Sequence, residues 1–395
     1  MDDLLPFYEK ELTFLRRHAR EFAERYPKVA TRLLISGEAC EDPHVERLLQ
    51  SFALLSARIS KKIENDFPEI TESLLEVLYP HYLRPFPSCS IVRFDAGGAD
   101  AQLSGPVRLP RGTPLTARPT RGTACKFRTA YAVTLSPLAI SSASFDDAVS
   151  ASKGLRSSTE ASHVLSLGFE TRSPQLPLDA LAQDRVRVFL DGDNSLISQL
   201  REALFARSLG FALEADPSRP WTSVNAMVIS PVGFADDEAL LDYDARSQPA
   251  YRLLSEYFAF PDKFNFIDID FSVLRALLPT GCRRFSLKCL LKSPRGGAED
   301  ARLLERLSVQ NFLLGCTPVV NLFTQNAEPV RLNRTRSAYP VVADSRRAYA
   351  TEIYRINAVR KEEKSAQGEV IVDYHPIFSL RHAESLAERG RFWHL

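Results

Sequence analysis

The chain has 395 residues, of which 45% are hydrophobic and 25% are charged, and these fractions exclude a largely disordered protein. Its 50 Lys and Arg residues balance 49 Asp and Glu residues, which argues against a nucleic-acid partner because phosphate binding needs a basic excess. The sequence contains no apolar run of about 18 residues and begins with an acidic, polar segment. We therefore expect a cytoplasmic protein without a membrane-inserted segment.

The first predicted element is an amphipathic helix over residues 7–26. Charged residues occupy most of its surface, and Pro27 interrupts the pattern. Its apolar residues recur in steps of three and four, the spacing of a seam between packed helices. They are Tyr8, Leu12, Leu15, Ala19, Phe22 and Tyr26.

A second helix is predicted to begin at Pro43, with Asp42 as its N-cap. It ends near residue 67, and a short third helix follows up to residue 79. The second helix carries its own apolar seam, again in steps of three and four: Val45, Leu48, Phe52, Leu55 and Ile59. The pattern alone favours a bundle within the chain, but the same seams would also suit a bundle shared with other chains.

Beyond Pro80 the sequence changes to short alternating segments typical of strands. Helices are few and irregularly placed here, which argues against a doubly wound parallel sheet. We predict an α+β fold with a helical region at 1–85 and mainly antiparallel, strand-rich domains at 86–245 and 246–395. Residues 141–162 are rich in serine and are predicted to form an exposed loop within the first of these domains.

The cysteines and histidines give no sign of a metal site. The six Cys residues include no CxxC pair, the seven His residues are scattered, and no HExxH motif occurs. The neighbours of the Cys residues are those of a protein core, so we expect buried free thiols. No fingerprint of a nucleotide-binding loop or nucleophile elbow is present, and we expect no cofactor.

Two groups of charged residues remain to be explained. Asp268 and Asp270 lie on the same side of a predicted strand, where a solvated face is the favoured interpretation and a catalytic pair of carboxylates is the alternative. The arginines of residues 331–347 have no aromatic stacking platform between them, so we favour salt bridges or solvation over RNA binding. They are Arg331, Arg334, Arg336, Arg346 and Arg347.

Several short segments of the sequence resemble segments that occur in the same order in one known family. They are residues 42–49 (DPHVERLL), 84–88 (RPFPS), 109–113 (LPRGT), 125–129 (CKFRT), 254–264 (LSEYFAFPDKF) and 316–323 (CTPVVNLF). The last two are long and rich in Phe and Pro, so they are hard to produce by chance. Over essentially its whole length, the chain resembles the TssF family (also called ImpG or VasA) of type VI secretion system baseplate proteins.

The resemblance implies a structural, non-enzymatic protein of a contractile, phage-tail-like injection system. Its implied partners are a second TssF copy and TssG in the baseplate wedge, with TssE, TssK and the VgrG spike nearby. The implied location is the cytoplasm, at a baseplate docked on the inner membrane. Family members continue beyond segments similar to residues 374–376 and 392–394, so the resemblance also predicts a further C-terminal region that this chain lacks.

Phe-rich and Arg-rich surfaces are suited to large protein interfaces. The alternative function is a strand-rich hydrolase or binding module with an unrecognised pocket, for which Asp268 and Asp270 are the candidate residues. Ten apolar residues are predicted to lie at subunit contacts or to define the fold. They are Leu12, Leu15, Phe22, Leu48, Phe52, Leu55, Phe258, Phe260, Phe264 and Phe323.

Overall fold

The structure is a computed structural model of the 395-residue chain. It describes residues 2–36, 39–66, 68–95, 98, 103–120, 122–147, 161–243, 247–294, 297–333, 338–365, 368–377 and 392–393. The contacts divide the chain into two compact units. Unit 1 comprises Met1–Arg84 and Ile356–Leu395, and unit 2 comprises Pro85–Arg355.

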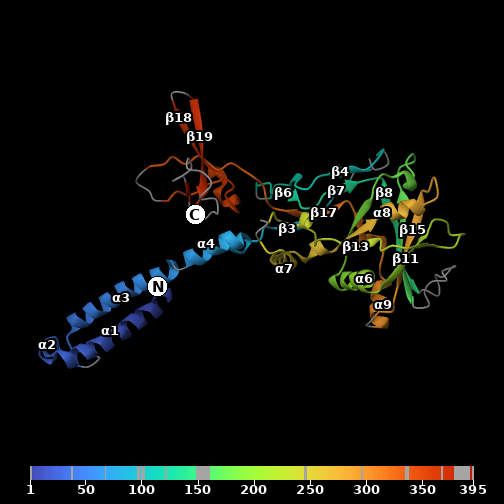
Figure 1. Ribbon diagram of the computed structural model, residues 1–395. Helices are drawn as coiled ribbons and strands as arrows, with labels where there is room; N and C mark the ends of the chain where they lie inside the picture. The colour runs from blue at the N-terminus through green and yellow to red at the C-terminus, as the bar shows by residue number, and fades with distance from the viewer. Residues whose placement is uncertain are drawn as a thin grey trace. The chain divides into compact units, whose positions relative to one another are not determined.

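Unit 1 begins with helices in the predicted order, and α1 and α3 form a hairpin (Figure 1). The N-cap prediction for α3 is confirmed, because the Asp42 carboxylate accepts a hydrogen bond of 2.8 Å from the backbone N–H of His44. The two-stranded ribbon β1–β2 lies in the connection between α2 and α3. The elements are η1 (Asp2–Leu4), α1 (Leu5–Arg25), α2 (Pro27–Arg32), β1 (Ile35–Ser36), β2 (Ala39–Cys40), α3 (Pro43–Asp66), α4 (Pro68–Leu78) and η2 (Pro80–Leu83).

Alanines, and not the predicted apolar seam, form the most buried face of α3. Ala53 and Ala57 have no exposed surface. Small side chains permit close approach of two helices, and an ion pair of 2.8 Å between Arg16 and Glu46 links α1 to α3. Of the predicted seam, Val45 is half-buried, whereas Leu48 is 73% exposed and Phe52, Leu55 and Ile59 are each more than half exposed. A bundle within the chain, which the pattern alone favoured, therefore does not cover these four residues.

The remainder of unit 1 is a small sheet formed late in the chain. Strands β18 (Val359–Ser365) and β19 (Gly368–Pro376) form an antiparallel hairpin with seven paired positions. Strand β20 (Phe392–Trp393) adds to β19 in parallel orientation. It is the one parallel pairing among the strands that the structure describes.

Unit 2 contains two antiparallel sheets with a shared hydrophobic core. Helix α6 (Asn194–Ala206) packs Leu200 and Leu204 into this core, and α8 (Phe271–Leu277) contributes Phe271 and Leu274. The five-stranded sheet has the spatial order β12 (Thr222–Val224), β11 (Ser208–Glu214), β15 (Arg284–Leu291), β9 (His163–Thr171) and β8 (Leu138–Asp147). The four-stranded sheet has the order β13 (Ile229–Pro231), β14 (Phe266–Asp270), β10 (Arg185–Leu190) and β16 (Phe312–Leu314).

A second core in unit 2 surrounds Tyr131 and Phe266, whose rings lie 5.5 Å apart at their centroids. Strand β17, formed by residues 316–320 (CTPVV), is buried along its whole length within the third sheet. This sheet has the order β3 (Cys89–Arg93), β17 (Cys316–Val320), β6 (Lys126–Thr129) and β5 (Pro114–Thr116), and a separate ribbon pairs β4 (Val107–Leu109) with β7 (Val133–Leu135).

Short helices complete unit 2. Helix α7 is followed closely by η6, and the segment LSEYFAFPDKF (residues 254–264) runs from α7 through η6. The bounds are η4 (Leu178–Ala180), η5 (Asp236–Glu238), α7 (Pro249–Ala259), η6 (Pro261–Phe264), α9 (Ala298–Leu304), η7 (Val309–Asn311) and η8 (Ser345–Ala350).

The α+β, mainly antiparallel fold with an N-terminal helical region is confirmed. The predicted serine-rich loop is wrong at residues 141–147, which belong to β8: their backbone pairs with β9, and Phe145 is buried. Residues 148–160 of that loop lie outside the described residues. The predicted domain boundary between residues 245 and 246 falls inside unit 2. Whether the three predicted domains fold independently is not tested by this division, so the three domains remain a prediction.

The six cysteines are free thiols, as expected. Cys282, Cys289 and Cys316 are buried, and Cys40 and Cys89 are half-buried. Cys125 is exposed, so the expectation of burial is wrong for that residue. Its position in the loop before β6 explains the difference, because the local sequence is strand-like but the sheet begins only at Lys126. Among the described helices, none is long and apolar enough to cross a membrane.

From the close packing of α1 and α3, we predict that a larger side chain at position 57 destabilises the hairpin. In the Ala57→Leu variant, the larger side chain overfills a site with no free surface, and we expect the hairpin to lose about 1–3 kcal/mol of stability. Amide hydrogen exchange of α1 and α3 measures this loss as faster exchange. The Leu55→Ala variant, on the exposed side of α3, is the control and should change the protection by no more than about 0.5 kcal/mol. Equal effects of both variants would contradict the packing described.

Candidate functional site

The first candidate site is an apolar surface on the helical hairpin of unit 1. Steps of three and four residues place its members on one side of α3, about opposite Ala53 and Ala57. We call this surface the α3 stripe. It consists of Leu48, Phe52, Leu55, Ile59 and Ile63, all of which are more than half exposed.

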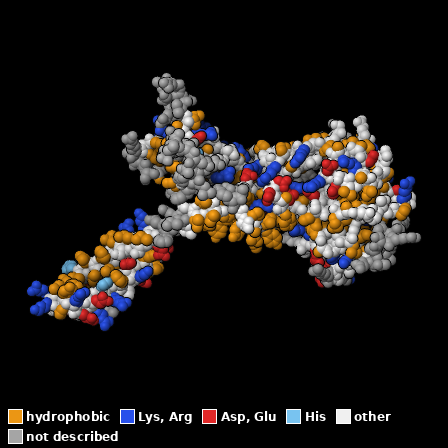
Figure 2. All heavy atoms as spheres, viewed as in Figure 1, with side chains coloured by type: hydrophobic (Ala, Val, Ile, Leu, Met, Phe, Trp, Pro, Cys, Tyr) orange, Lys and Arg blue, Asp and Glu red, His pale blue; other side chains and the backbone are white. Residues whose placement is uncertain are grey.

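Helix α1 contributes differently from α3. Leu12 and Leu15 are half-buried, as expected for residues that face α3, whereas Phe22 is about one-third exposed near the end of the helix. Phe14 lies on the outer side of α1, more than half exposed, with its ring 4.9 Å from that of His18. The hairpin thus presents apolar side chains outward from both helices, which Figure 2 shows as orange groups among charged ones. Exposed apolar surface of this extent is typical of a binding site for another protein.

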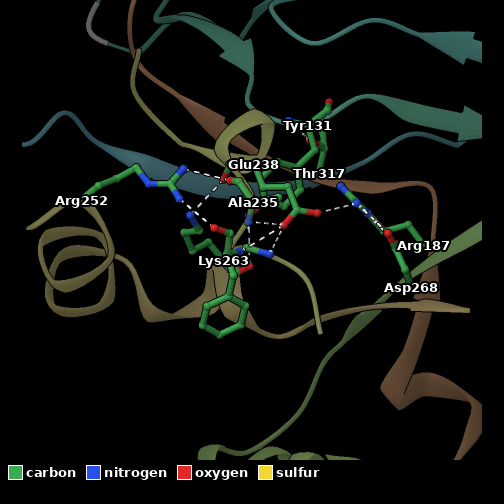
Figure 3. Close-up of polar contacts among 10 residues, drawn as sticks. Tyr131, Arg187, Ala235, Glu238, Arg252, Lys263, Asp268 and Thr317 are labelled. Carbon is green, nitrogen blue, oxygen red and sulfur yellow. Dashed lines mark hydrogen bonds and ion pairs between the residues drawn. The ribbon is translucent and has the colours of Figure 1, made fainter. Parts of the chain in front are cut away.

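The second candidate site lies in unit 2, where a network of charged residues is enclosed beneath helix α7 (Figure 3). The Lys263 ammonium forms an ion pair with the Glu256 carboxylate, and neither side chain has exposed surface. Lys263 also donates a hydrogen bond of 3.0 Å to the backbone carbonyl of Glu238. Glu256 accepts a further hydrogen bond of 2.8 Å from the backbone N–H of Leu240. Burial lowers the pKa of Lys263, and the charge of Glu256 opposes this effect.

Glu238 organises the segment on which α7 rests. One of its carboxylate oxygens accepts hydrogen bonds from the backbone N–H groups of residues 233–235, at 2.6, 3.1 and 3.2 Å. The other oxygen accepts a hydrogen bond of 2.8 Å from Arg187. Gly233 has a φ of 107°, and a Cβ at this position would lie 2.9 Å from the Phe264 ring, so the tight turn requires glycine.

Arg187 connects this network to the four-stranded sheet. Its guanidinium group donates two hydrogen bonds of 2.8 Å to the two carboxylate oxygens of Asp268 on the neighbouring strand. Burial acts to lower the pKa of Arg187, but the hydrogen bonds to Asp268 and the charges of Asp268 and Glu238 outweigh it and raise the pKa. Arg187 therefore remains a cation that satisfies two buried carboxylates.

The structure assigns Asp268 and Asp270 to structural interactions. Asp268 is buried in the ion pair with Arg187, so the interpretation of a solvated face is wrong for this residue. Asp270 caps α8 by accepting hydrogen bonds from the backbone N–H groups of Ser272 and Val273. The hydrogen bond from the Ser272 hydroxyl is the main reason that the pKa of Asp270 is lowered. Both carboxylates are thus engaged in structural contacts, and the lowered pKa of Asp270 does not suit a general acid.

A groove of about 1240 Å³ in unit 2 passes over the Arg187–Asp268 pair. Arginines and acidic residues line it in equal numbers, so it lacks the excess of positive charge that a phosphate backbone requires. The charged lining residues are Arg93, Arg108, Arg111, Arg172, Arg185, Arg187, Asp95, Asp184, Asp191, Asp237, Glu238 and Asp268.

No group of three or more His, Cys, Asp and Glu residues within the described ranges is arranged to hold a metal ion. Of the predicted arginine cluster, Arg331, Arg346 and Arg347 are exposed. Arg334 and Arg336 lie outside the described residues.

The four predicted phenylalanines of unit 2 occupy different environments. Phe264 is buried between Phe234 and Tyr257, and Phe260 is half-buried against the second core. Phe323 is partly exposed, with the Lys126 ammonium 4.8 Å from its ring centroid, a cation–π distance. Phe258 is 80% exposed on α7.

Sequence reasoning missed the buried charges Glu238, Glu256 and Lys263. The last two belong to the segment LSEYFAFPDKF, in which they are seven positions apart. Their pairing depends on the end of α7 at Ala259 and the start of η6 at Pro261, which the helical spacing of the segment does not predict.

Known proteins are similar to this chain over most of its length. The family described as "Type VI secretion system, TssF" matches residues 1–395. The type VI secretion system component TssF1 of Pseudomonas aeruginosa is 34% identical over 360 residues, which cover 90% of this chain and 57% of that protein.

A solved structure of a TssK–TssF–TssG baseplate subcomplex of the type VI secretion system contains a chain that superimposes with a TM-score of 0.68 and 27% identity. This match covers 88% of the present chain and 62% of that one. The chain therefore spans somewhat more than half the length of these relatives.

The buried ion pair between Lys263 and Glu256 leads to a prediction for the free energy of unfolding and for its dependence on pH. In the Glu256→Gln variant Lys263 loses its counter-ion, and we expect a loss of about 3–5 kcal/mol at pH 7. Without Glu256 the folded-state pKa of Lys263 falls further below its unfolded value. The unfolded state then binds more protons between these two pKa values, so the stability of the variant should rise with pH toward about 10.

Urea denaturation at pH 7 and pH 9.5 measures both effects. The matched control is Asp237→Asn, which removes a carboxylate from an exposed position in the neighbouring segment and should change stability by less than about 0.5 kcal/mol. A Glu256→Gln variant as stable as the control, or one that loses stability as the pH rises, would contradict the assignment.

Proposed function

Because the chain belongs to the TssF family of the type VI secretion system, we propose that it is a structural subunit of the baseplate and acts through protein–protein interfaces. The exposed α3 stripe is the observation that carries this proposal. A helical hairpin that buries alanines inside and presents Leu, Ile and Phe outside has its larger apolar face available for another chain. In this proposal the protein contributes shape and binding surface, and no reaction is assigned to it.

TssG and TssK are the proposed direct partners. In the similar solved complex, a TssF chain is assembled with proteins of these two names. The family resemblance adds a second TssF copy, TssE and the vicinity of the VgrG spike as further proposed neighbours. It also supports the proposed location, a cytoplasmic baseplate docked at the inner membrane.

The α3 stripe is proposed to enter a helical bundle shared between subunits. Its residues are spaced like those of a helix-packing seam, so they suit insertion of side chains between the residues of facing helices. Burying one such Leu, Ile or Phe side chain contributes about 1.5–3 kcal/mol relative to full exposure. Residues Leu12 and Leu15 would support this bundle from within the hairpin, and Phe22 would extend its apolar surface.

Co-purification tests the proposed bundle. We expect the Leu48→Asp plus Phe52→Asp variant to remain folded, because both residues are exposed, and to lose at least about nine-tenths of the TssG retained by the unchanged chain. The matched control is Arg47→Asp plus Arg58→Asp, which introduces carboxylates at exposed positions outside the stripe and should retain TssG. Far-UV circular dichroism verifies the helical content of both variants. Retention of TssG by the stripe variant, or its unfolding, would show that the stripe is not an interface.

A further inference from the structure

Helix α7 has its polar side buried and its apolar side exposed. Arg252 and Glu256 point inward and are buried, whereas the outer side presents four large apolar or aromatic side chains. We call these four residues the α7 face. They are Tyr251, Leu254, Tyr257 and Phe258, each more than half exposed. An amphipathic helix on the surface of a protein normally has the reverse orientation, with its apolar side in the core.

Ionic and hydrogen-bonded contacts hold the helix in this orientation (Figure 3). Arg252 donates hydrogen bonds of 2.8 and 2.9 Å to the backbone carbonyls of Phe234 and Ala235. One turn later, Glu256 is paired with the buried Lys263. Turning the helix to bury its aromatic side chains would leave these buried charges without partners, which is strongly unfavourable. The apolar face is therefore fixed toward the outside.

The α7 face is large enough to contribute substantially to an interface. Phe234 extends it, because Phe234 and Tyr257 both contact the Phe264 ring, at centroid distances of 5.2 and 6.1 Å, and Phe234 is itself half exposed. At about 150–250 Å² for each large side chain, the exposed parts of these five residues add up to roughly 450–700 Å². A standard interface buries about 800 Å² per partner, and the largest apolar patch on a typical monomer, about 300–600 Å², is often functional. Figure 2 shows hydrophobic side chains gathered over the position of α7.

The charges beside the α7 face define the partner that would fit it. Asp236, which is almost fully exposed and lies 3.7 Å from the Arg252 guanidinium group, and Asp237 follow Phe234 closely in the sequence. The cations Arg252 and Lys263 are buried and already bound. A second copy placed symmetrically on this face would bring acidic groups toward acidic groups, whereas a partner with basic residues beside its apolar ridge would complement them.

We infer that the α7 face binds an amphipathic helix of another baseplate subunit, one whose apolar ridge is flanked by Lys or Arg. The apolar ridge packs against Leu254 and Phe258, and the flanking cations pair with Asp236 and Asp237. This inference rests on the proposed function only in placing the partner within the baseplate. The surface lies in unit 2 and is separate from the α3 stripe of unit 1.

Photo-crosslinking within the assembled complex tests the inference. The aromatic photo-crosslinker p-benzoylphenylalanine replaces Phe258 in the full chain, which is then purified with TssG and TssK from the same secretion system. Mass spectrometry of the crosslinked peptide identifies the partner segment. We expect one crosslink, to a helical segment with an apolar ridge and at least two adjacent basic residues. The control carries the same crosslinker in place of Arg219, which is also exposed in unit 2 but lies in a loop before β12, and should give no such crosslink.

The outcomes separate this inference from the proposed function. If the three proteins do not assemble, the proposed function fails. If they assemble but position 258 gives no crosslink, or crosslinks to a second copy or to a segment without flanking basic residues, the inference is overturned. The Asp236→Asn plus Asp237→Asn variant tests the charge argument in the same assembly. We expect its crosslink yield at position 258 to fall at least about threefold, and an unchanged yield would overturn the proposed charge complementarity.

Discussion

Buried charge is the constraint on which the arrangement of unit 2 depends. Lys263 and Glu256 are completely enclosed, and a single ion in such surroundings is far more costly than a pair with additional hydrogen bonds. Glu238 meets the same requirement with three backbone N–H groups and Arg187, which in turn satisfies Asp268. These contacts join helix α7, the segment before η5 and the four-stranded sheet. None of these parts can shift without leaving a buried charge unsatisfied.

The same constraint explains why an apolar surface faces outward on α7. Its buried side is already occupied by Arg252 and Glu256, so Leu254 and Phe258 have no space inside the unit. Helix α3 also has an apolar surface that faces outward, but the cause is different. Ala53 and Ala57 permit close packing against α1, so the larger side chains lie on the other side of the helix. In both helices the residues that stabilise the fold are distinct from the residues that are available to a partner. Such a division suits a subunit that folds first and assembles afterwards.

Three acidic residues of unit 2, Asp268, Asp270 and Glu238, stabilise its structure. Asp268 is neutralised by a two-pronged arginine contact, Asp270 caps a helix, and Glu238 holds a tight turn. The pKa of Asp270 is lowered, mainly by the hydrogen bond from the Ser272 hydroxyl, whereas a general acid needs a raised pKa. This chemistry agrees with the proposed structural role in the baseplate.

Local patterns in the sequence were sufficient to predict several features of this protein. The N-cap at Asp42, the helices around Leu48 and Leu74, the strand-rich body and the absence of a CxxC pair all depend on neighbouring residues, so spacing and composition reveal them. The words 254–264 and 316–323 were also sufficient to indicate the TssF family. Periodicity showed that α3 has an apolar side at Leu48, Phe52 and Leu55, which is correct as a statement about the helix alone.

Only the tertiary structure decided which side of each helix is covered. Two sides of α3 were suitable for packing, and the closeness of α1 selected Ala53 and Ala57 over the larger residues. Residues 141–147 resemble a loop in composition, yet backbone pairing with β9 makes them a strand. Arg187 and Asp268 are 81 positions apart, so their pairing arises from strand register and not from any local pattern. Contacts between distant segments determine which residues are buried, and a sequence pattern records only the order of residues along the chain.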